Sequence, residues 1–165
     1  MTDIQTRYDA IVFDNDGVIV EPTARSHLVD AVLEAFREFG HEPDREYAAE
    51  TVATAAGPHD TVGDYDIDIE AFWKRREDAA AAAQKAATRD GGKRPYDDVA
   101  VLERFDVPLG LVSNNQAETV AFLLEYHDLP DFETAYGRAH SVEGASRRKP
   151  EPYYIERALS DLETI

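Results

Sequence analysis

Apolar residues follow two different periods along the chain, and each period predicts a different kind of element. Residues 8–13, YDAIVF, form a short β-rich run that ends at an Asp-Asn-Asp-Gly cluster and predict a buried strand. The apolar run 107–112 ends in Ser-Asn-Asn and predicts a second buried strand, and 134–136 predicts a shorter third one. Helices are predicted over six segments, which are 23–39, 46–56, 67–87, 97–104, 116–126 and 152–162.

Two segments interrupt these elements and indicate how the chain is divided. Residues 57–66 are rich in Gly, Pro and Asp and predict a loop, whereas 89–95, RDGGKRP, predict a hinge or linker. Strands that alternate with helices favour parallel pairing, and ligands of such α/β sheets bind beyond the carboxyl ends of the strands. Residues 18–92 contain no predicted strand. We interpret them as a helical insertion that covers the ligand-binding edge of the sheet.

Composition narrows the class of protein. The 165 residues suffice for one core domain that carries a small inserted module. Cysteine is absent, which excludes disulfides and thiolate metal sites, and the five histidines show no close metal-ligand spacing. No apolar run approaches the roughly 18 residues of a membrane span, and the apolar stretch near the N-terminus is too short for a signal peptide. We expect a soluble, cytoplasmic protein without a membrane partner. The sequence does not indicate its oligomeric state.

Charge narrows the class of partner. The chain has 34 acidic and 17 basic residues and a formal net charge of −17. A field of that sign repels phosphate backbones, so nucleic acid is not expected as a partner. The acidic residues are spread along the whole chain, which resembles the solvated surfaces of proteins from salt-loving microbes, whose high salt screens the repulsion. An ordinary acidic protein is the alternative.

The first candidate for chemistry is an aspartate pair at the predicted carboxyl edge of the sheet. Asp14 follows the first predicted strand directly, and Asp16 lies two residues further on. Two carboxylates so close together can divide labour, one attacking an electrophile or binding a divalent cation while the other exchanges a proton. The alternative is that Asp-Asn-Asp-Gly is only a polar turn.

Two further motifs reach the same predicted edge. Ser113 and Asn114 follow the second predicted strand and can donate hydrogen bonds to a phosphate oxygen, although a helix cap is the alternative. Lys149 ends the cationic run Arg147-Arg148-Lys149 ahead of the last predicted helix. In so acidic a chain these cations need an anionic partner, and a phosphate at the sheet edge would supply it. A solvated loop is the alternative.

Together the three motifs resemble a known family. FDNDGV at 13–18, VSNN at 112–115 and KPEPYYIERAL at 149–159 resemble, in order and spacing, the first three motifs of the haloacid dehalogenase superfamily. The helical block is similar to the cap of the subgroup that includes phosphoglycolate phosphatase and β-phosphoglucomutase. The resemblance implies an α/β fold with a Rossmann-like parallel sheet core of residues 1–17 and 93–165 and an inserted all-helical cap of residues 18–92.

The same resemblance implies a role for each residue. Asp14 would be the nucleophile that forms an aspartyl-phosphate, and Asp16 the general acid and then the base. Both would bind Mg²⁺, Asp16 through its backbone carbonyl. Ser113, Asn114 and Lys149 would bind the phosphoryl group, with Lys149 also offsetting the charge of Asp14. The implied function is a Mg²⁺-dependent phosphatase acting on a small phosphorylated metabolite, such as phosphoglycolate or a sugar phosphate.

One departure keeps alternatives open. The fourth motif of the family, an acidic pair or Gly-Asp element that follows a further strand, is not found before Ile165. We expect that the intact protein continues into that strand and that the core as given lacks its C-terminal part. The alternatives are a catalytically impaired or truncated protein of this fold with a binding role, and a haloacid dehalogenase. Asp16 disfavours the dehalogenase, because dehalogenation needs no protonation of the leaving group. A phospho-acceptor signalling domain is disfavoured by the helical insertion.

Overall fold

A three-stranded parallel sheet forms the centre of the molecule in the computed structural model, which describes residues 8–163. The strands are β1 (Ile11–Phe13), β2 (Leu109–Gln116) and β3 (Thr134–Arg138), in the order β1-β2-β3. Gly110 of β2 pairs with Val12 on one side and with Thr134 on the other. The parallel pairing and the alternation of strands with helices confirm the predicted α/β class.

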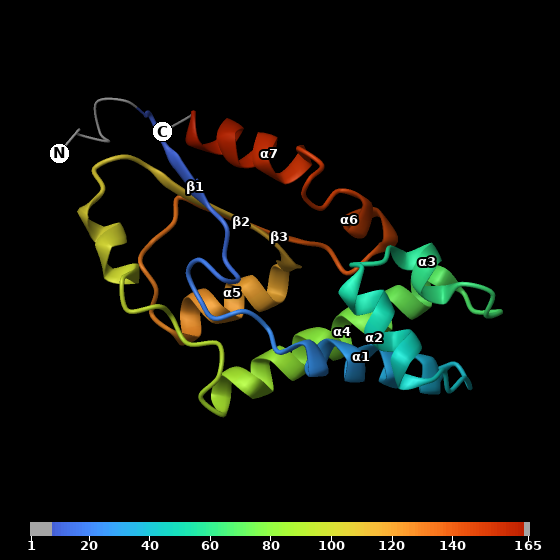
Figure 1. The fold of residues 1–165 in the computed structure, drawn as a ribbon. Coiled ribbons are helices and arrows are strands. Elements are labelled where there is room, and N and C mark those ends of the chain that lie inside the picture. Colours follow the sequence, from blue (N-terminus) through green and yellow to red (C-terminus); the bar gives the residue numbers. More distant parts are fainter. Residues whose placement is uncertain (1–7, 164–165) are drawn as a thin grey trace.

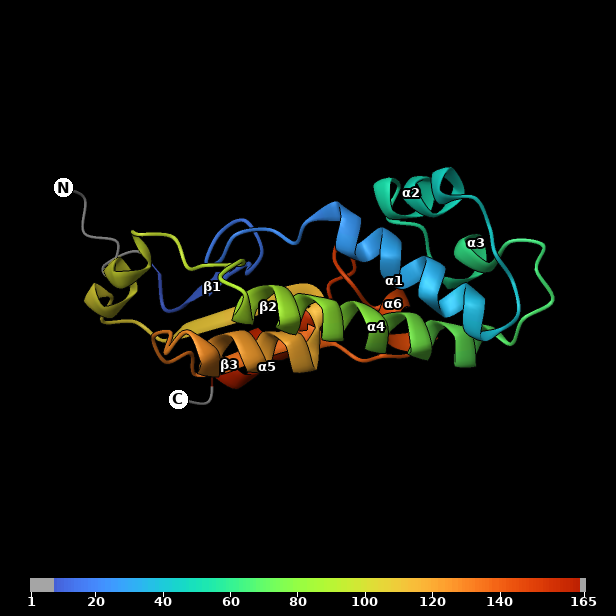
Figure 2. The same ribbon diagram turned by 90° about the horizontal axis from the view of Figure 1, so that it is seen from below.

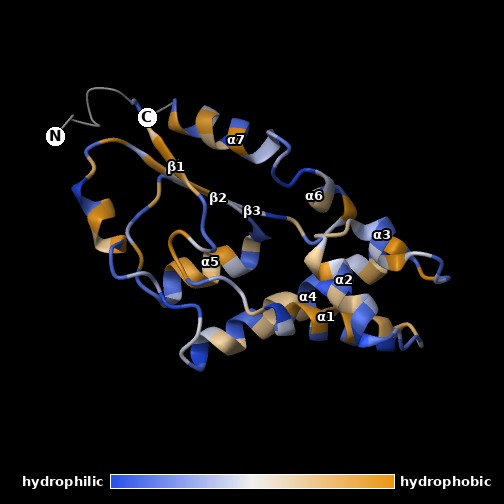
Figure 3. Cartoon of the chain, viewed as in Figure 1, coloured by the Kyte–Doolittle hydropathy of each residue, from blue (hydrophilic) through white to orange (hydrophobic). Residues whose placement is uncertain are grey.

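Helices cover both faces of this sheet. Figure 1 shows α7 (Tyr153–Leu162) on one face and α5 (Ala117–Tyr126) on the other. Successive residues of a strand point to opposite faces, so Leu111 packs with Val120 of α5 whereas Val112 packs with Tyr154 of α7. Both faces of β2 are therefore buried, which explains its continuous apolar run (Figure 3).

Four further helices lie beyond the carboxyl ends of the strands (Figures 1 and 2). We call residues 25–89 the helical unit, and its helices are α1 (Arg25–Glu38), α2 (Arg45–Ala53), α3 (Pro58–Val62) and α4 (Ile69–Arg89). The unit has its own apolar cluster, in which the ring of Phe36 lies 4.6 Å from that of Phe72 and 4.9 Å from that of Tyr65 between centroids. Ile19 and Val20, which precede the unit, pack with the sheet instead.

Helix α4 is the long element that connects the helical unit to the sheet. Its start is capped by Asp68, whose side chain accepts a hydrogen bond from the backbone N–H of Ala71. It packs along α1 on one side and reaches α5 on the other, where Lys85 forms an ion pair with Glu118. Between residues 8 and 163, no helix combines the length and the apolar character needed to cross a membrane.

The structure corrects the predicted elements at three short segments. The predicted loop 57–66 contains α3, which begins at Pro58. The segment before Lys149 contains a second short helix, α6 (Val142–Ser146), capped by the hydroxyl of Ser141. Both have five residues, too few to display a helical period in the sequence. The predicted helix 97–104 is a 3₁₀ helix, η2 (Val99–Arg104).

The second strand is longer than predicted. The apolar run predicted a strand that ends at Val112, but β2 continues through the polar residues to Gln116. Its pairing with β3 shifts register after Val112 and resumes where Gln116 lies opposite Arg138. The irregularity places Ser113 and Asn114 within the distorted end of a strand rather than after it.

The central strand provides a direct test of this core. Leu111 is fully buried in the cluster between the sheet and α5, so we expect Leu111→Ala to lower the free energy of unfolding by about 2–5 kcal/mol. Leu159, on the outer side of α7, is 45% exposed, and Leu159→Ala serves as the control. Urea denaturation measures both changes. Equal losses in the two variants would contradict the described packing of β2.

Candidate active site

The carboxyl end of β1 presents a carboxylate that is paired with a lysine. Asp14 follows Phe13 directly, and its side chain is 48% exposed. Lys149 Nζ lies 3.0 Å from Asp14 Oδ1 and donates a hydrogen bond of 2.8 Å to the carbonyl oxygen of Val112. The backbone N–H of Asn15 also donates to Oδ1, whereas Oδ2 has no hydrogen-bond partner among the described residues. Oδ2 is therefore the oxygen that can react or bind a cation.

The end of β2 positions Lys149 against this carboxylate. The amide side chain of Asn114 makes two hydrogen bonds with the backbone of Lys149, accepting from its N–H at 2.7 Å and donating to its carbonyl at 3.0 Å. Ser113 is buried, and its hydroxyl accepts a hydrogen bond from the N–H of Asn115. The structure thus brings Asp14, Ser113, Asn114 and Lys149 to one edge, but the amide of Asn114 already holds the lysine loop.

Asp16 is held by two side chains that the sequence did not single out. Lys93, which is 4% exposed, donates to Asp16 Oδ1, and Asn115 donates to Oδ2 at 3.0 Å. Lys93 also donates to the hydroxyl of Thr23 at 2.8 Å. Lys93 belongs to the predicted linker 89–95. It is one of only four lysines in the chain, and this rarity was the sequence feature that could have marked it as a site residue. Asp16 is therefore held by the segment that follows α4 and by the end of β2.

The backbone from Asn15 to Val20 forms a tight turn. The carbonyl of Asn15 accepts hydrogen bonds from the N–H groups of Val18, Ile19 and Val20, and Gly17 adopts a φ of 82°. A positive φ is strained for other residues, which explains the glycine. The Asn15 side chain is fully buried, and its amide atoms find no hydrogen-bond partner within residues 8–163. The middle residue of the motif thus lies in the interior.

A buried ionic cluster joins α4 to the ends of β2 and β3. Glu77 of α4 is fully buried and accepts a hydrogen bond of 2.6 Å from Arg76 and one of 2.7 Å from Gln116. Its other cationic partner is Arg138, whose Nη1 lies 2.8 Å from Glu77 Oε2. Arg138 also donates to the carbonyl of Asn114 at 2.6 Å. Gly137, the neighbour of Arg138, lies close to the backbone of Ala117. A side chain does not fit there, because a Cβ atom on residue 137 would lie 2.6 Å from the Cα of Ala117.

The arginines keep Glu77 ionised in the interior. Burial raises the pKa of a carboxyl group, but here Arg76 and Arg138 outweigh it and hold the pKa of Glu77 below its ordinary value. A carboxyl group with a lowered folded-state pKa stabilises the fold above its unfolded-state pKa. That stabilisation is lost as the pH falls through the ordinary glutamate value of 4.5 towards the lower folded-state value.

Two adjoining cavities lie between the helical unit and the sheet edge. One has a volume of about 260 Å³ and is lined by Asp16, Gln84 and Asn115 among others. The second, of about 170 Å³, includes Trp73 and Arg148. Both are also lined by the same four residues, which are Leu28, Arg76, Asn114 and Arg138. The two cavities are therefore neighbours at the end of the sheet where the aspartate motif lies.

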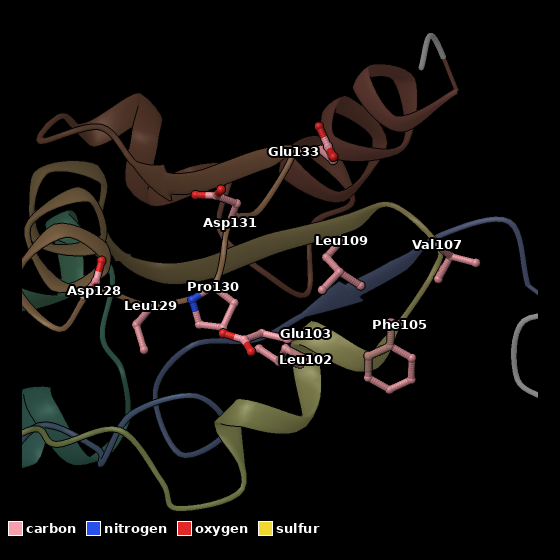
Figure 4. Close-up of a pocket in the computed structure, with 10 residues that line it drawn as sticks. All are labelled: Leu102, Glu103, Phe105, Val107, Leu109, Asp128, Leu129, Pro130, Asp131 and Glu133. Atoms are coloured by element: carbon pink, nitrogen blue, oxygen red, sulfur yellow. The ribbon is translucent and has the colours of Figure 1, made fainter.

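A third depression, of about 440 Å³, lies elsewhere. Figure 4 shows it where β2 begins, with Leu109 and Pro130 in its wall. The carboxylates of Glu103, Asp131 and Glu133 also line it. Acidic walls repel phosphate esters, and the depression is at the amino end of β2, away from the aspartate motif.

The residues of the candidate site fit a shared Mg²⁺ site. Mg²⁺ prefers oxygen ligands and usually takes one or two carboxylates, keeping several waters and a substrate phosphate as its other ligands. Asp14 Oδ2 and the backbone carbonyl of Asp16 are oxygen donors of this kind. Over residues 8–163, no group of three or more His, Asp or Glu side chains converges as a metal cage. The donor set therefore suits a cation that is bound jointly with a phosphate.

Comparisons with known proteins agree with this arrangement. A model of the haloacid dehalogenase-like hydrolase family matches residues 8–164. CbbY from Rhodobacter sphaeroides, solved with xylulose-(1,5)bisphosphate, is 17% identical, with a TM-score of 0.64 over 94% of this chain and 72% of that one. A predicted phosphoglycolate phosphatase from Haemophilus somnus is 15% identical, with a TM-score of 0.52 over 91% and 69%. At these identities the structures show a shared fold. No curated protein matches the chain.

The buried cluster predicts a pH-dependent stability. We expect Glu77→Gln to lower the free energy of unfolding by about 3–5 kcal/mol at neutral pH, because it leaves two buried arginines without their carboxylate. The difference from the unmodified protein should shrink as the pH falls from 4.5, the ordinary pKa of a glutamate in the unfolded chain, towards the lower pKa at which Glu77 is protonated in the fold. Urea denaturation from neutral to acidic pH measures it. Glu50→Gln, at an exposed position of α2, is the control, and a constant difference at all pH values would contradict the cluster.

Proposed function

The chain belongs to the haloacid dehalogenase-like hydrolase family, and we propose that it is a Mg²⁺-dependent phosphatase that hydrolyses a small phosphate monoester. The observation that carries the proposal is the carboxylate of Asp14 at the strand end. One of its oxygens is held by Lys149, while the other is unengaged within the described residues. A carboxylate oxygen in that setting can attack phosphorus and form an aspartyl-phosphate. The structural relatives that are described as phosphatases support the same reaction class.

In the first step, Asp14 Oδ2 forms a bond to phosphorus, and the bond from phosphorus to the ester oxygen breaks. A proton from the carboxyl group of Asp16 goes to the departing oxygen, which leaves as an alcohol. Lys149 lies against Asp14 and stabilises the negative charge of the phosphoryl group during transfer. Ser113 and the adjacent backbone at the end of β2 would bind the phosphoryl oxygens.

In the second step, a water molecule attacks phosphorus and the bond from phosphorus to Asp14 breaks, releasing inorganic phosphate. Asp16 takes the proton from the water and so returns to its starting state. Lys93 and Asn115 each hold one oxygen of the Asp16 carboxylate, which keeps the group in one orientation through both steps. Mg²⁺, held by Asp14 and the carbonyl of Asp16, would supply charge neutralisation for the phosphoryl oxygens.

The helical unit would act as the cap of this site, with residues 18–92 inserted into a core of residues 1–17 and 93–165. Its position beyond the carboxyl ends of the strands supports that role, because a cover there excludes water from a reaction at Asp14 (Figure 1). The cavities beneath it, of about 260 and 170 Å³, are of a size for a small metabolite, such as phosphoglycolate or a sugar phosphate.

A binding role without turnover is the second candidate. It is favoured by the lack of a three-carboxylate metal cage within residues 8–163. The two candidates differ in their use of Mg²⁺, since only the phosphatase needs the cation for phosphate release.

The nucleophile predicts the outcome of one substitution. We expect the protein to release p-nitrophenolate from p-nitrophenyl phosphate in the presence of Mg²⁺. The release should stop when a chelator is added. Asp14→Asn should reduce the rate by at least about 10³-fold, because an amide cannot replace the carboxylate nucleophile. Steady-state assays measure both effects.

The matched control for this substitution is Asp131→Asn, which removes an exposed carboxylate from the acidic depression at the amino end of β2. It should retain full activity. Undiminished activity of Asp14→Asn would refute the mechanism. The binding role would be favoured if the unmodified protein showed no activity either with or without Mg²⁺ and yet bound phosphate esters tightly in titration calorimetry.

A further inference from the structure

Three arginines converge on the cavities between the helical unit and the sheet. Arg76 comes from α4, Arg138 from the end of β3, and Arg148 from the loop before Lys149. All three line the cavity of about 170 Å³, and Arg76 and Arg138 also line the adjoining one. The cations therefore come from both sides of the cavity, with Arg76 from the helical unit, Arg138 from the end of the sheet and Arg148 from the loop between α6 and α7.

Acidic side chains do not balance these cations. Glu77 pairs with both Arg76 and Arg138, so one carboxylate serves two guanidinium groups. Arg148 has no acidic partner in the described part of the chain and donates a hydrogen bond to the carbonyl of Ala55. Three arginines against one glutamate leave two formal positive charges at the cavity. Asp16, the only acidic residue among those that line either cavity, is already paired with Lys93.

The arginines also repel one another. Burial lowers the pKa of Arg148, and the charges of Arg138 and Arg76 lower it further. Arg76 Nε is buried without a hydrogen-bond partner within residues 8–163. A protein of net charge −17 has many carboxylates with which arginines could pair, yet within the described residues Glu77 is the one carboxylate that pairs with any of these three. Such a cluster attracts anions, because a recess lined by one sign of charge concentrates its field.

We propose that Arg76, Arg138 and Arg148 form a subsite for a second anionic group, a carboxylate or a second phosphate, on the same substrate whose ester phosphate reacts at Asp14. This inference rests on the proposed phosphatase function and names its substrate class as small phosphate esters that carry a second anionic group. Planar guanidinium groups suit both anions, since each can offer two parallel N–H donors.

The position of the subsite fits a small substrate. Asp16, the proposed acid, lines the same cavity as Arg76 and Arg138, so the departing oxygen and the second anion would occupy one continuous space. Leu28 and Trp73 provide apolar walls, and the guanidinium carbon of Arg76 lies 5.0 Å from the centroid of the Trp73 ring. A second anion would contact the helical unit and the sheet at once. The substrate would therefore be recognised only when the helical unit covers the site.

The experiment compares substrates that differ only in the second anion. Phosphoglycolate is paired with hydroxyethyl phosphate, which replaces the carboxylate by a hydroxymethyl group. Fructose 1,6-bisphosphate is paired with fructose 1-phosphate and fructose 6-phosphate, so the two pairs distinguish a carboxylate from a second phosphate. We expect kcat/KM to be at least about tenfold higher for the member of one pair that carries the second anionic group, the effect of a charge-assisted hydrogen bond.

Arg148→Gln should remove most of that preference, about tenfold, while hydrolysis of p-nitrophenyl phosphate and hydroxyethyl phosphate stays unchanged. The matched control is Arg147→Gln, because the neighbouring arginine pairs with Glu143 and does not line either cavity. It should keep the preference. An equal loss of activity on all substrates in Arg148→Gln would show a purely structural arginine and overturn the subsite, as would equal kcat/KM values within both pairs.

Binding separates this inference from the proposed function. Titration calorimetry of the same compounds with Asp14→Asn protein requires no turnover, and we expect a preference of at least about tenfold for the compound with the second anionic group there too. That preference in the absence of any phosphatase activity of the unmodified protein would refute the proposed function and keep the subsite. Equal affinities within both pairs would refute the subsite whatever the activity.

Discussion

The arrangement of the carboxyl edge of the sheet depends on the ion pairs and the hydrogen bond of the buried Glu77 carboxylate. Glu77 joins α4 to two strands at once, because it contacts Arg138 at the end of β3 and Gln116 at the end of β2. Both contacts are withdrawn from water, so their strength is not screened by solvent. Removing the carboxylate would leave buried cations unpaired, whereas a surface ion pair contributes little to stability. The position of the helical unit over the strand ends is therefore linked to one ionised group.

The same contacts divide the edge into two electrostatic regions. Near β1, Asp14 and Asp16 are each paired with a lysine, and these pairs carry the proposed chemistry. Beneath α4, arginines exceed carboxylates and provide attraction for an anion. A net charge of −17 over the chain would repel phosphorylated compounds from most of the surface. A local excess of arginine at the covered end of the sheet reverses this repulsion where the substrate would bind.

Much of the fold and part of the site could be predicted from the sequence, for identifiable physical reasons. The buried strand β2 has a continuous apolar run, and the long helices α1 and α4 have clear apolar periods. Parallel topology places Asp14 and Ser113 at one edge of the sheet, and Lys149 reaches that edge from the loop before α7. The five-residue helices were too short for any period. The pairing of Glu77 with Arg138 joins residues 61 positions apart, and periodicity carries no information on such contacts. Lys93 is one of only four lysines, but it was overlooked because it lies in a predicted glycine-rich linker, where a buried lysine is not expected.

The central claim is that Asp14 carries the phosphoryl group as a covalent intermediate. The most direct measurement is peptide mapping by mass spectrometry after an acid quench, on Asp16→Asn protein that has been incubated with Mg²⁺ and a phosphate ester. Without the base that activates water, the intermediate should persist. The account predicts the added mass of one phosphoryl group on the peptide that contains Asp14. Turnover of the ester without any phosphorylated peptide, or the group on another residue, would contradict it.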